Sequence, residues 1–91
     1  MTIPGYQSIM LPLLRLAGDG RELRTRDAIE LLAAEFGLTA DERKQLLPSG
    51  QARTWDNRVN WAATYLRKAE VLETPRRGYI AITDRGRNIL A

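Results

Sequence analysis

The chain has 91 residues and a net charge of +3, from 14 Lys and Arg against 11 Asp and Glu, and it contains neither histidine nor cysteine. This length suits one domain with one modest hydrophobic core, so two domains would not fit. Without His or Cys, a disulfide, a zinc site of the usual N/S type and a Cys- or His-based nucleophilic pair are excluded. We therefore expect a non-catalytic domain over residues 1–91, without a cofactor or a metal ion.

The N-terminal stretch shows no targeting signal. Residues 1–5 include no basic residue, and the apolar run from Ile9 to Leu16 is short and interrupted by Pro12 and Arg15. Neither a signal peptide nor a membrane span is recognisable, so the default prediction is a cytoplasmic protein that does not contact a membrane.

The first predicted helix runs from about Tyr6 to Ala17, where apolar residues recur at helical spacing. Pro12 lies inside it and is expected to kink it or to mark its effective first turn. Gly18–Gly20 ends the pattern. The next segment, Glu22–Arg24, is too short to be more than a bridging strand.

A second helix follows, with Thr25 as its expected N-cap and Gly37 at its C-terminal end. Its apolar stripe consists of Ile29, Leu32, Ala33 and Phe36. Thr39 and Glu42 then have the spacing of a capping box and predict a short third helix. Its apolar end is Leu46 and Leu47, and the turn Pro48–Gly50 closes it.

The segment from Thr54 to Ala69 has two different faces when placed on a helix of about 100° per residue. One face is apolar and is expected to lie in the core, with Tyr65 at its border; it consists of Trp55, Val59, Ala62, Leu66 and Ala69. The opposite face carries amides, a hydroxyl, cations and a large aromatic side chain, without a carboxylate. Its residues are Asn57, Asn60, Trp61, Thr64, Arg67 and Lys68. This composition is unusual for a helix face that contacts only solvent.

Two short apolar strands, Val71–Thr74 and Tyr79–Ile82, flank a turn at Pro75–Gly78 and predict a hairpin with a basic tip. Tyr79 is assigned to the core, as are Trp55 and Tyr65. Thr83 can cap a last short helix, which Gly86 weakens and which turns Ile89 and Leu90 inward. The order of elements predicts a mainly α fold with a small β-hairpin, an α+β winged helix-turn-helix.

Positive charge is concentrated in the second half of the chain. Residues 1–50 hold six basic and seven acidic side chains, a net charge of −1, whereas residues 51–91 hold eight and four, a net charge of +4. Of the 14 basic residues 12 are Arg, whose planar guanidinium group suits phosphates and guanine edges. A high-GC genome, which favours Arg codons, explains this preference equally well.

The helix from Thr54 to Ala69 suits the major groove of DNA, where each base pair presents its own pattern of donors and acceptors. We expect four of its side chains to read bases: Asn57, Asn60, Trp61 and Thr64. Six cations are expected to contact the DNA backbone: Arg53, Arg58, Arg67, Lys68, Arg76 and Arg77. Each feature also has a structural interpretation, in which Asn57 caps the helix, Trp61 belongs to the rim of the core, and Arg76 and Arg77 only solubilise the turn.

The triplet Glu42-Arg43-Lys44, with Asp27 upstream, superficially matches the metal-binding core of many nucleases. That chemistry needs carboxylates that converge on a metal from adjacent strands. Both carboxylates are predicted to lie in the first turn of a helix, where the helix dipole explains them. We therefore do not interpret the triplet as catalytic.

Several sequence elements occur in an order that resembles one known family. They are Pro48-Ser49-Gly50-Gln51, Asn57-Arg58, Trp61-Ala62, Leu66, Lys68-Ala69 and the Arg-Arg-Gly turn before Ile82-Thr83, together with the opening Ile3-Pro4-x-Tyr6 and Leu11-Pro12-Leu13-Leu14. Over nearly its whole length the chain resembles the N-terminal domain of Mrr-type restriction endonucleases, which are modification-dependent and type IV-like. The resemblance implies a winged helix ahead of a PD-(D/E)xK nuclease domain, in a protein that cleaves DNA carrying methylated bases.

Because the sequence ends at Ala91, we expect the nuclease domain to be missing, and no catalytic role is carried over. The resemblance implies double-stranded DNA as the partner, with methylated bases as candidate targets, and a C-terminal nuclease domain in the full-length protein. A methyl group in the major groove can be read by an apolar contact from Trp61. Base flipping is not expected, because the aromatic residues are assigned largely to the core. The alternative is a winged-helix protein-interaction module with Trp61 as its anchor.

Overall fold

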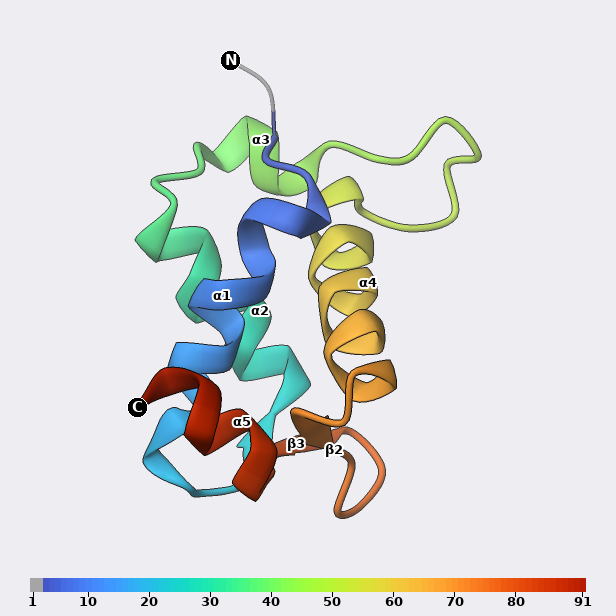
Figure 1. Ribbon diagram of the computed structural model, residues 1–91. Helices are drawn as coiled ribbons and strands as arrows, with labels where there is room; N and C mark the ends of the chain where they lie inside the picture. Colours follow the sequence, from blue (N-terminus) through green and yellow to red (C-terminus); the bar gives the residue numbers. More distant parts are fainter. Residues whose placement is uncertain (1–2) are drawn as a thin grey trace.

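A helical body closed at one end by a small antiparallel sheet is formed by residues 3–91, which the computed structural model describes (Figure 1). The first two residues of the stretch interpreted above as free of a targeting signal lie outside the described part. In chain order the elements are α1 (Tyr6–Leu16), the 3-10 turn η1 (Ala17–Asp19), β1 (Leu23–Arg24), α2 (Thr25–Glu35), α3 (Ala40–Lys44), α4 (Thr54–Lys68), β2 (Leu72–Glu73), β3 (Tyr79–Ile82) and α5 (Asp84–Leu90).

The sheet contains the predicted hairpin and one further strand. Its order is β1-β3-β2 with antiparallel pairing throughout, and Leu23 lies opposite Ile80 while Leu72 lies opposite Ile82. Side chains alternate along β3, so Ile80 and Ile82 point into the core. The short bridging strand predicted at 22–24 thereby becomes an edge of the sheet, and the α+β, winged-helix-like class is confirmed.

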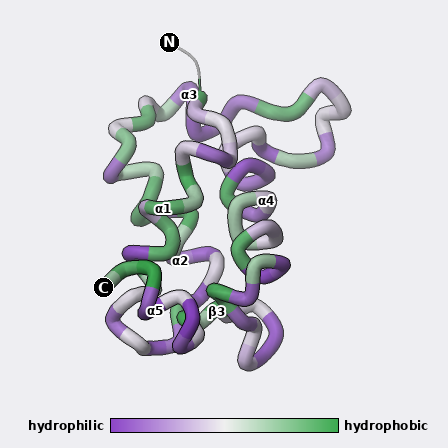
Figure 2. The backbone as a smooth tube through the Cα atoms, in the orientation of Figure 1, coloured by the Kyte–Doolittle hydropathy of each residue, from purple (hydrophilic) through white to green (hydrophobic). Residues whose placement is uncertain are grey.

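The core lies between α1, α2, α4 and the inner face of the sheet. Its largest fully buried side chains are Trp55, Ile9, Leu13, Leu32, Ile80 and Val59. Hydrophobic and hydrophilic stretches alternate along the helices (Figure 2), and the buried residues of α1, α2 and α4 recur at helical spacing, as expected when each helix turns one stripe toward the core. The most extensive packing in this core is between α1 and α4. No helix within residues 3–91 is long and apolar enough to cross a membrane.

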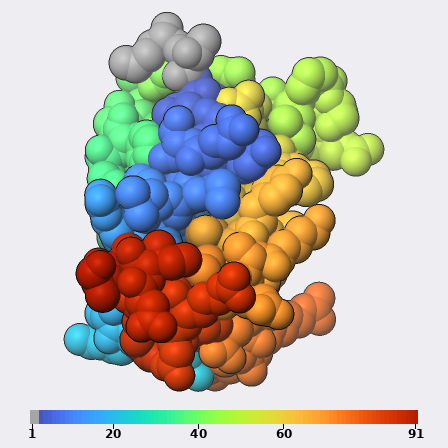
Figure 3. Space-filling model, in the orientation of Figure 1, coloured from blue at the N-terminus to red at the C-terminus, as the bar shows by residue number. Residues whose placement is uncertain are grey.

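Two segments project from this body (Figure 3). One is the loop before α4, which is held by the turn at Gly50 and by a bridge between Leu46 and Arg53. The other is the tip of the β2-β3 hairpin. Leu46 is therefore 54% exposed on a projecting loop, and the prediction that it gives α3 an apolar end is wrong.

Three other core assignments are also wrong. Ala69 is exposed because α4 ends at Lys68 and the chain turns away there. Tyr65 is 38% exposed because it lies at the border of the apolar face of α4, where its ring stacks on Tyr6 instead of entering the core. Ile89 is 58% exposed because α5 turns the face with Gly86 and Leu90 toward the body instead. Tyr79, which was also assigned to the core, is half-buried.

Thr25 does not cap α2. It is the first residue of the helix, Arg24 occupies the cap position, and no side chain caps the end. The backbone N–H of Thr25 instead donates to the carbonyl oxygen of Gly78 at 2.9 Å. This hydrogen bond ties the start of α2 to the hairpin tip. The caps predicted for α3 and α5, Thr39 with Glu42 and Thr83, are both confirmed.

Gly86 was predicted only to weaken α5, but in the structure it also allows close packing. A Cβ atom at this position would lie 2.3 Å from the carbonyl oxygen of Val71 and 2.7 Å from Ile82. The hydroxyl of Thr83 also donates to the carbonyl oxygen of Glu70 at 2.7 Å, on the same side. Only glycine therefore allows α5 to approach the chain that leaves α4.

We expect Gly86→Ala to lower the free energy of unfolding by about 1–3 kcal/mol, because the added methyl group meets backbone that cannot move alone. Urea unfolding followed by circular dichroism measures this. Gly5→Ala is the matched control, since a Cβ at Gly5 meets nothing within 4 Å. Equal unfolding midpoints for the two variants would contradict the packing role of Gly86.

Candidate nucleic-acid interface

The position of α4 is fixed at its first turn by Trp55. Its side chain is fully buried, and its indole N–H donates to the carbonyl oxygen of Ile29 in α2 at 2.9 Å. The ring also packs against Phe36, with 5.5 Å between ring centroids. A buried indole needs a hydrogen-bond partner, and this one is supplied by the helix on which α4 rests.

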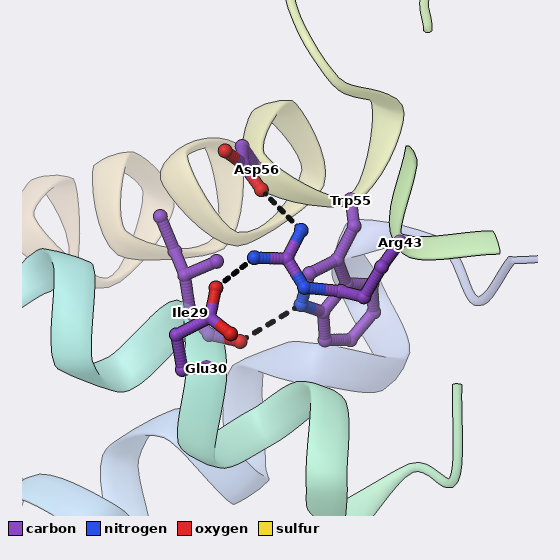
Figure 4. Close-up of polar contacts among 5 residues, drawn as sticks. All are labelled: Ile29, Glu30, Arg43, Trp55 and Asp56. Carbon is purple, nitrogen blue, oxygen red and sulfur yellow. Dashed lines mark hydrogen bonds and ion pairs between the residues drawn. The ribbon is translucent and has the colours of Figure 1, made fainter. Parts of the chain in front are cut away.

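Arg43 joins α3 to both of its neighbours (Figure 4). Its guanidinium group forms one ion pair with Asp56 of α4, at 2.9 Å, and another with Glu30 of α2. The side chains of Arg43 and Asp56 are 15% and 34% exposed, so this pair is less screened by water than surface pairs, whereas Glu30 is 64% exposed. Arg43, the middle residue of the nuclease-like triplet, thus holds the three helices together.

The carboxylate of Glu42 is engaged in the helix cap rather than directed at a metal. It accepts a hydrogen bond from the backbone N–H of Thr39 at 2.8 Å, and the Thr39 hydroxyl accepts one from Glu42 at 3.1 Å. Among residues 3–91 no group of three potential ligands is placed to hold a metal ion.

The predicted base-reading residues all lie on the outer side of α4. Asn60 and Trp61 are exposed, Trp61 by 47%, and Asn57 and Thr64 are half-buried. The Thr64 hydroxyl donates to the carbonyl oxygen of Asn60 at 2.9 Å and accepts from Arg67 at 3.2 Å. Its hydrogen-bonding capacity is therefore partly used within the helix, whereas the amide of Asn60 faces solvent.

Of the six cations predicted to contact the DNA backbone, two, Arg58 and Arg76, bind elsewhere in the protein. The other four are exposed: Arg53, Arg67, Lys68 and Arg77. Arg58 is half-buried and donates to the carbonyl oxygens of Ile3 and Pro4, at 2.7 and 3.1 Å, so it holds the N-terminal segment on α4.

Arg76 is exposed but engaged in two contacts. It pairs with Glu22 at 2.8 Å and lies 4.0 Å from the ring centroid of Tyr79. These contacts hold the guanidinium group beside the sheet. The neighbouring Arg77 is exposed at the hairpin tip and forms no ion pair within residues 3–91.

Arg24 and Arg26, at the start of α2, were missed by the sequence analysis. The structure brings both beside the hairpin, where they line a hollow with Thr25, Arg77, Gly78 and Tyr79. Arg26 also lines the adjoining hollow, together with Arg53 and Asn60 of α4. The two hollows share Thr25 and Arg26, and the second is also lined by Glu30 and Asp56. The four arginines along them, Arg53, Arg26, Arg24 and Arg77, are here called the basic strip. The sequence did contain a signal for this strip, since Arg24 and Arg26 stand on either side of Thr25, the predicted N-cap of the second helix.

The guanidinium group of Arg24 lies against Tyr79. It donates to the tyrosine hydroxyl at 3.4 Å and its central carbon is 5.8 Å from the ring centroid. The hydrogen bond to Tyr79 is the main cause that raises the pKa of Arg24 above its usual value.

A second feature lies on the other edge of α4, where three aromatic side chains gather at the surface. Tyr6 of α1 stacks on Tyr65 with 4.8 Å between centroids and 13° between planes, and Trp61 lies 6.0 Å from Tyr65. Burial and the nearby Tyr65 hydroxyl raise the pKa of Tyr6. The three rings line a hollow of about 230 Å³ with Asn57 and Arg58, here called the aromatic hollow. The assignment of aromatic residues largely to the core is thus wrong.

Comparison with known proteins identifies relatives of the chain. The family model described as the Mrr N-terminal domain matches residues 6–91. Among curated proteins, the type IV methyl-directed restriction enzyme EcoKMrr of Escherichia coli strain K12 is 33% identical over 87 residues. The match covers 94% of this chain but only 28% of that enzyme, so the chain spans little more than a quarter of its relative. No solved structure matches the chain significantly.

Replacing Arg43 tests how α4 is held. We expect Arg43→Met to lower the free energy of unfolding by about 1–3 kcal/mol, because Asp56 is left partly buried without its partner. Arg85→Met is the matched control, since Arg85 meets Glu70 between side chains that are 67% and 78% exposed, and it should have little effect. Urea unfolding of both variants measures the difference, and equal losses would contradict the role of Arg43.

Proposed function

From the fact that the chain belongs to the Mrr N-terminal domain family, we propose that it is the non-catalytic DNA-recognition domain of a restriction system. In this proposal α4 enters the major groove, and the basic strip together with Arg67 and Lys68 contacts phosphates. The observation that carries the proposal is that Arg26 lines both hollows, so the strip connects Arg53 before α4 with the start of α2 and with Arg77 at the hairpin tip.

The outer side of α4 has the chemistry that base recognition needs. The amides of Asn57 and Asn60 can each donate and accept, as adenine requires, and Trp61 offers an apolar surface to a methyl group. A base methylated in the major groove presents such a group, so we propose Trp61 as the side chain that distinguishes methylated bases. Thr64 contributes less, because its hydroxyl is already hydrogen-bonded to Asn60 and Arg67.

The strip is suited to phosphates because several nearby carboxylates are engaged by cations outside it. Asp56 and Glu30 both pair with Arg43, and Glu22 pairs with Arg76. Arg26, Arg53 and Arg77 form no ion pair within residues 3–91, and Arg24 is the member of the strip that lies near a further carboxylate, that of Asp27. Arg58 holds the N-terminal segment and Arg76 pairs with Glu22. In this proposal both residues stabilise the surface and contribute less to the phosphate contacts.

We propose that residues 1–91 form one domain and that cleavage resides elsewhere in a longer protein. EcoKMrr, of which the chain spans 28%, is described as a restriction enzyme, and its remaining length leaves room for a nuclease domain. The described residues show no carboxylate cluster that could hold a catalytic metal ion.

A second candidate function is suggested by the exposure of Trp61. An indole that is 47% exposed beside Tyr65 fits the anchor of a protein interface, where aromatic residues are enriched. In this alternative the domain docks a nuclease or another subunit. The basic strip favours DNA, because a protein-docking surface does not need four cations in a row.

The strip predicts a salt-dependent affinity for duplex DNA of any sequence. Log affinity should fall with log salt by roughly 0.9 for each phosphate that a cation neutralises. Arg26→Ala and Arg77→Ala should each weaken binding to all sequences and reduce this slope by roughly 1, as measured by fluorescence anisotropy. Arg85→Ala, with the same change of charge on α5, should leave the slope unchanged. Absence of duplex binding at low salt would refute the proposal.

The outer side of α4 predicts selectivity rather than affinity. The test compares duplexes that are unmodified, carry N6-methyladenine or carry C5-methylcytosine. Asn60→Ala and Trp61→Ala should change the differences in binding free energy among these duplexes by roughly 1–3 kcal/mol per lost contact. Competition binding measures these differences. If the wild-type protein binds all three duplexes equally, it is a general DNA-binding domain. Self-association that Trp61→Ala abolishes, without DNA binding, would support the docking alternative.

A further inference from the structure

We propose that the aromatic hollow takes a single nucleobase that has left the base stack and rests it against the indole of Trp61. The inference builds on the proposed DNA binding and names a second contact beside the groove-reading side of α4. It concerns unpaired bases, whereas the proposed contacts of α4 in the major groove recognise the edges of paired bases.

The three rings of the hollow are not equivalent. Tyr65 is covered by Tyr6, which stacks on it at 4.8 Å and nearly in parallel, so these two rings form a fixed wall. Trp61 is tilted by 34° from Tyr65 and is 47% exposed, which leaves its indole surface open to a partner. A base has a planar face of the kind that stacks on such a ring.

The size of the hollow limits what can occupy it. Its volume of about 230 Å³ is smaller than the roughly 300–1,000 Å³ of sites that take drug-sized ligands. One planar ring system suits this space, whereas a peptide helix would need a long groove. The hollow is open to solvent, so it fits a base that is already unpaired better than one that must be extruded and enclosed.

Asn57 connects the aromatic hollow with the groove-reading side of α4. Its amide lines this hollow and also a shallower one of about 160 Å³, which it shares with Asn60, Trp61 and Thr64. Asn57 and Trp61 thus stand between the two. The Asn57 amide offers a donor and an acceptor to the edge of a base that lies beside Trp61. The adjacent nucleotides would remain along α4.

The charge around the hollow favours nucleic acid over an acidic protein surface or a neutral ligand. None of its lining residues is a carboxylate. Arg58 contributes a positive charge to the wall, and the Lys68 ammonium group lies 5.5 Å from the Tyr65 ring centroid. A phosphate next to an unstacked base would meet these cations, whereas an apolar partner would leave them unused.

The test compares two duplexes that differ only in a single bulged 2-aminopurine, whose fluorescence falls when it stacks on an aromatic ring. We expect the wild-type protein to bind the bulged duplex roughly fivefold more tightly than the paired one, or more, in line with base–aromatic stacking. The fluorescence of the bulged base should fall on binding. Trp61→Ala should bring the affinity ratio close to one, and Trp61→Phe should restore part of it.

Leu31→Ala is the matched control, because Leu31 is a 51% exposed apolar side chain on α2 that lines neither hollow. It should leave the ratio unchanged. Arg77→Ala should weaken both duplexes alike and so also leave the ratio unchanged. The ratio, rather than the affinity itself, therefore reports on the hollow.

The outcomes separate this inference from the proposed function. A wild-type ratio of one, or a ratio that Trp61→Ala does not change, overturns the inference while duplex binding that depends on Arg77 stands. Binding of the bulged duplex alone, dependent on Trp61, supports the hollow and overturns the proposed duplex recognition. Self-association that requires Trp61, without preference for the bulge, assigns the hollow to a second copy of the chain and also overturns the inference.

Discussion

The arrangement depends on the burial of Trp55 at the first turn of α4. Its ring fills the space between α2 and α4, and its indole N–H bonds to Ile29. Because a helix is rigid over its length, fixing this turn decides which side of α4 faces outward. Arg43 adds the rotational constraint, since it holds Asp56 on α4 and Glu30 on α2 at once. Asn57, Asn60 and Trp61 need no contact with the core to be presented at the surface.

The sheet performs the equivalent task for the cations. Pairing of β1 with β3 sets Arg24 opposite Tyr79, and the hydrogen bond from Thr25 to Gly78 keeps the start of α2 at the hairpin tip. Residues more than 50 positions apart thereby share one basic strip. The strip is thus a product of strand register, and a shift by one residue would turn Arg24 to the other face.

Local patterns predicted most of the fold. The spacing of apolar residues located α1, α2 and α4, and the capping box at Thr39 was read correctly because both partners are close in sequence. Errors arose where a residue's environment depends on distant parts of the chain. Ile89 has the spacing of a core residue, yet Gly86 sets the approach of α5 through a contact with Val71. Arg24 and Arg26 were overlooked because only the pairing of β1 with β3 brings them to the hairpin.

A net charge of +3 understates how basic the outer surface is, because the ion pairs are unevenly placed. Glu70 and Asp84 are paired with Arg85 and Arg87, and Asp19 with Arg21, away from the strip. Asp56, on the edge of α4 that borders the strip, is paired with Arg43. The cations with no carboxylate partner within residues 3–91 include Arg24, Arg26, Arg53, Arg67, Lys68 and Arg77. Since affinity for DNA follows the number of phosphates neutralised rather than the overall charge, this distribution matters more than the sum.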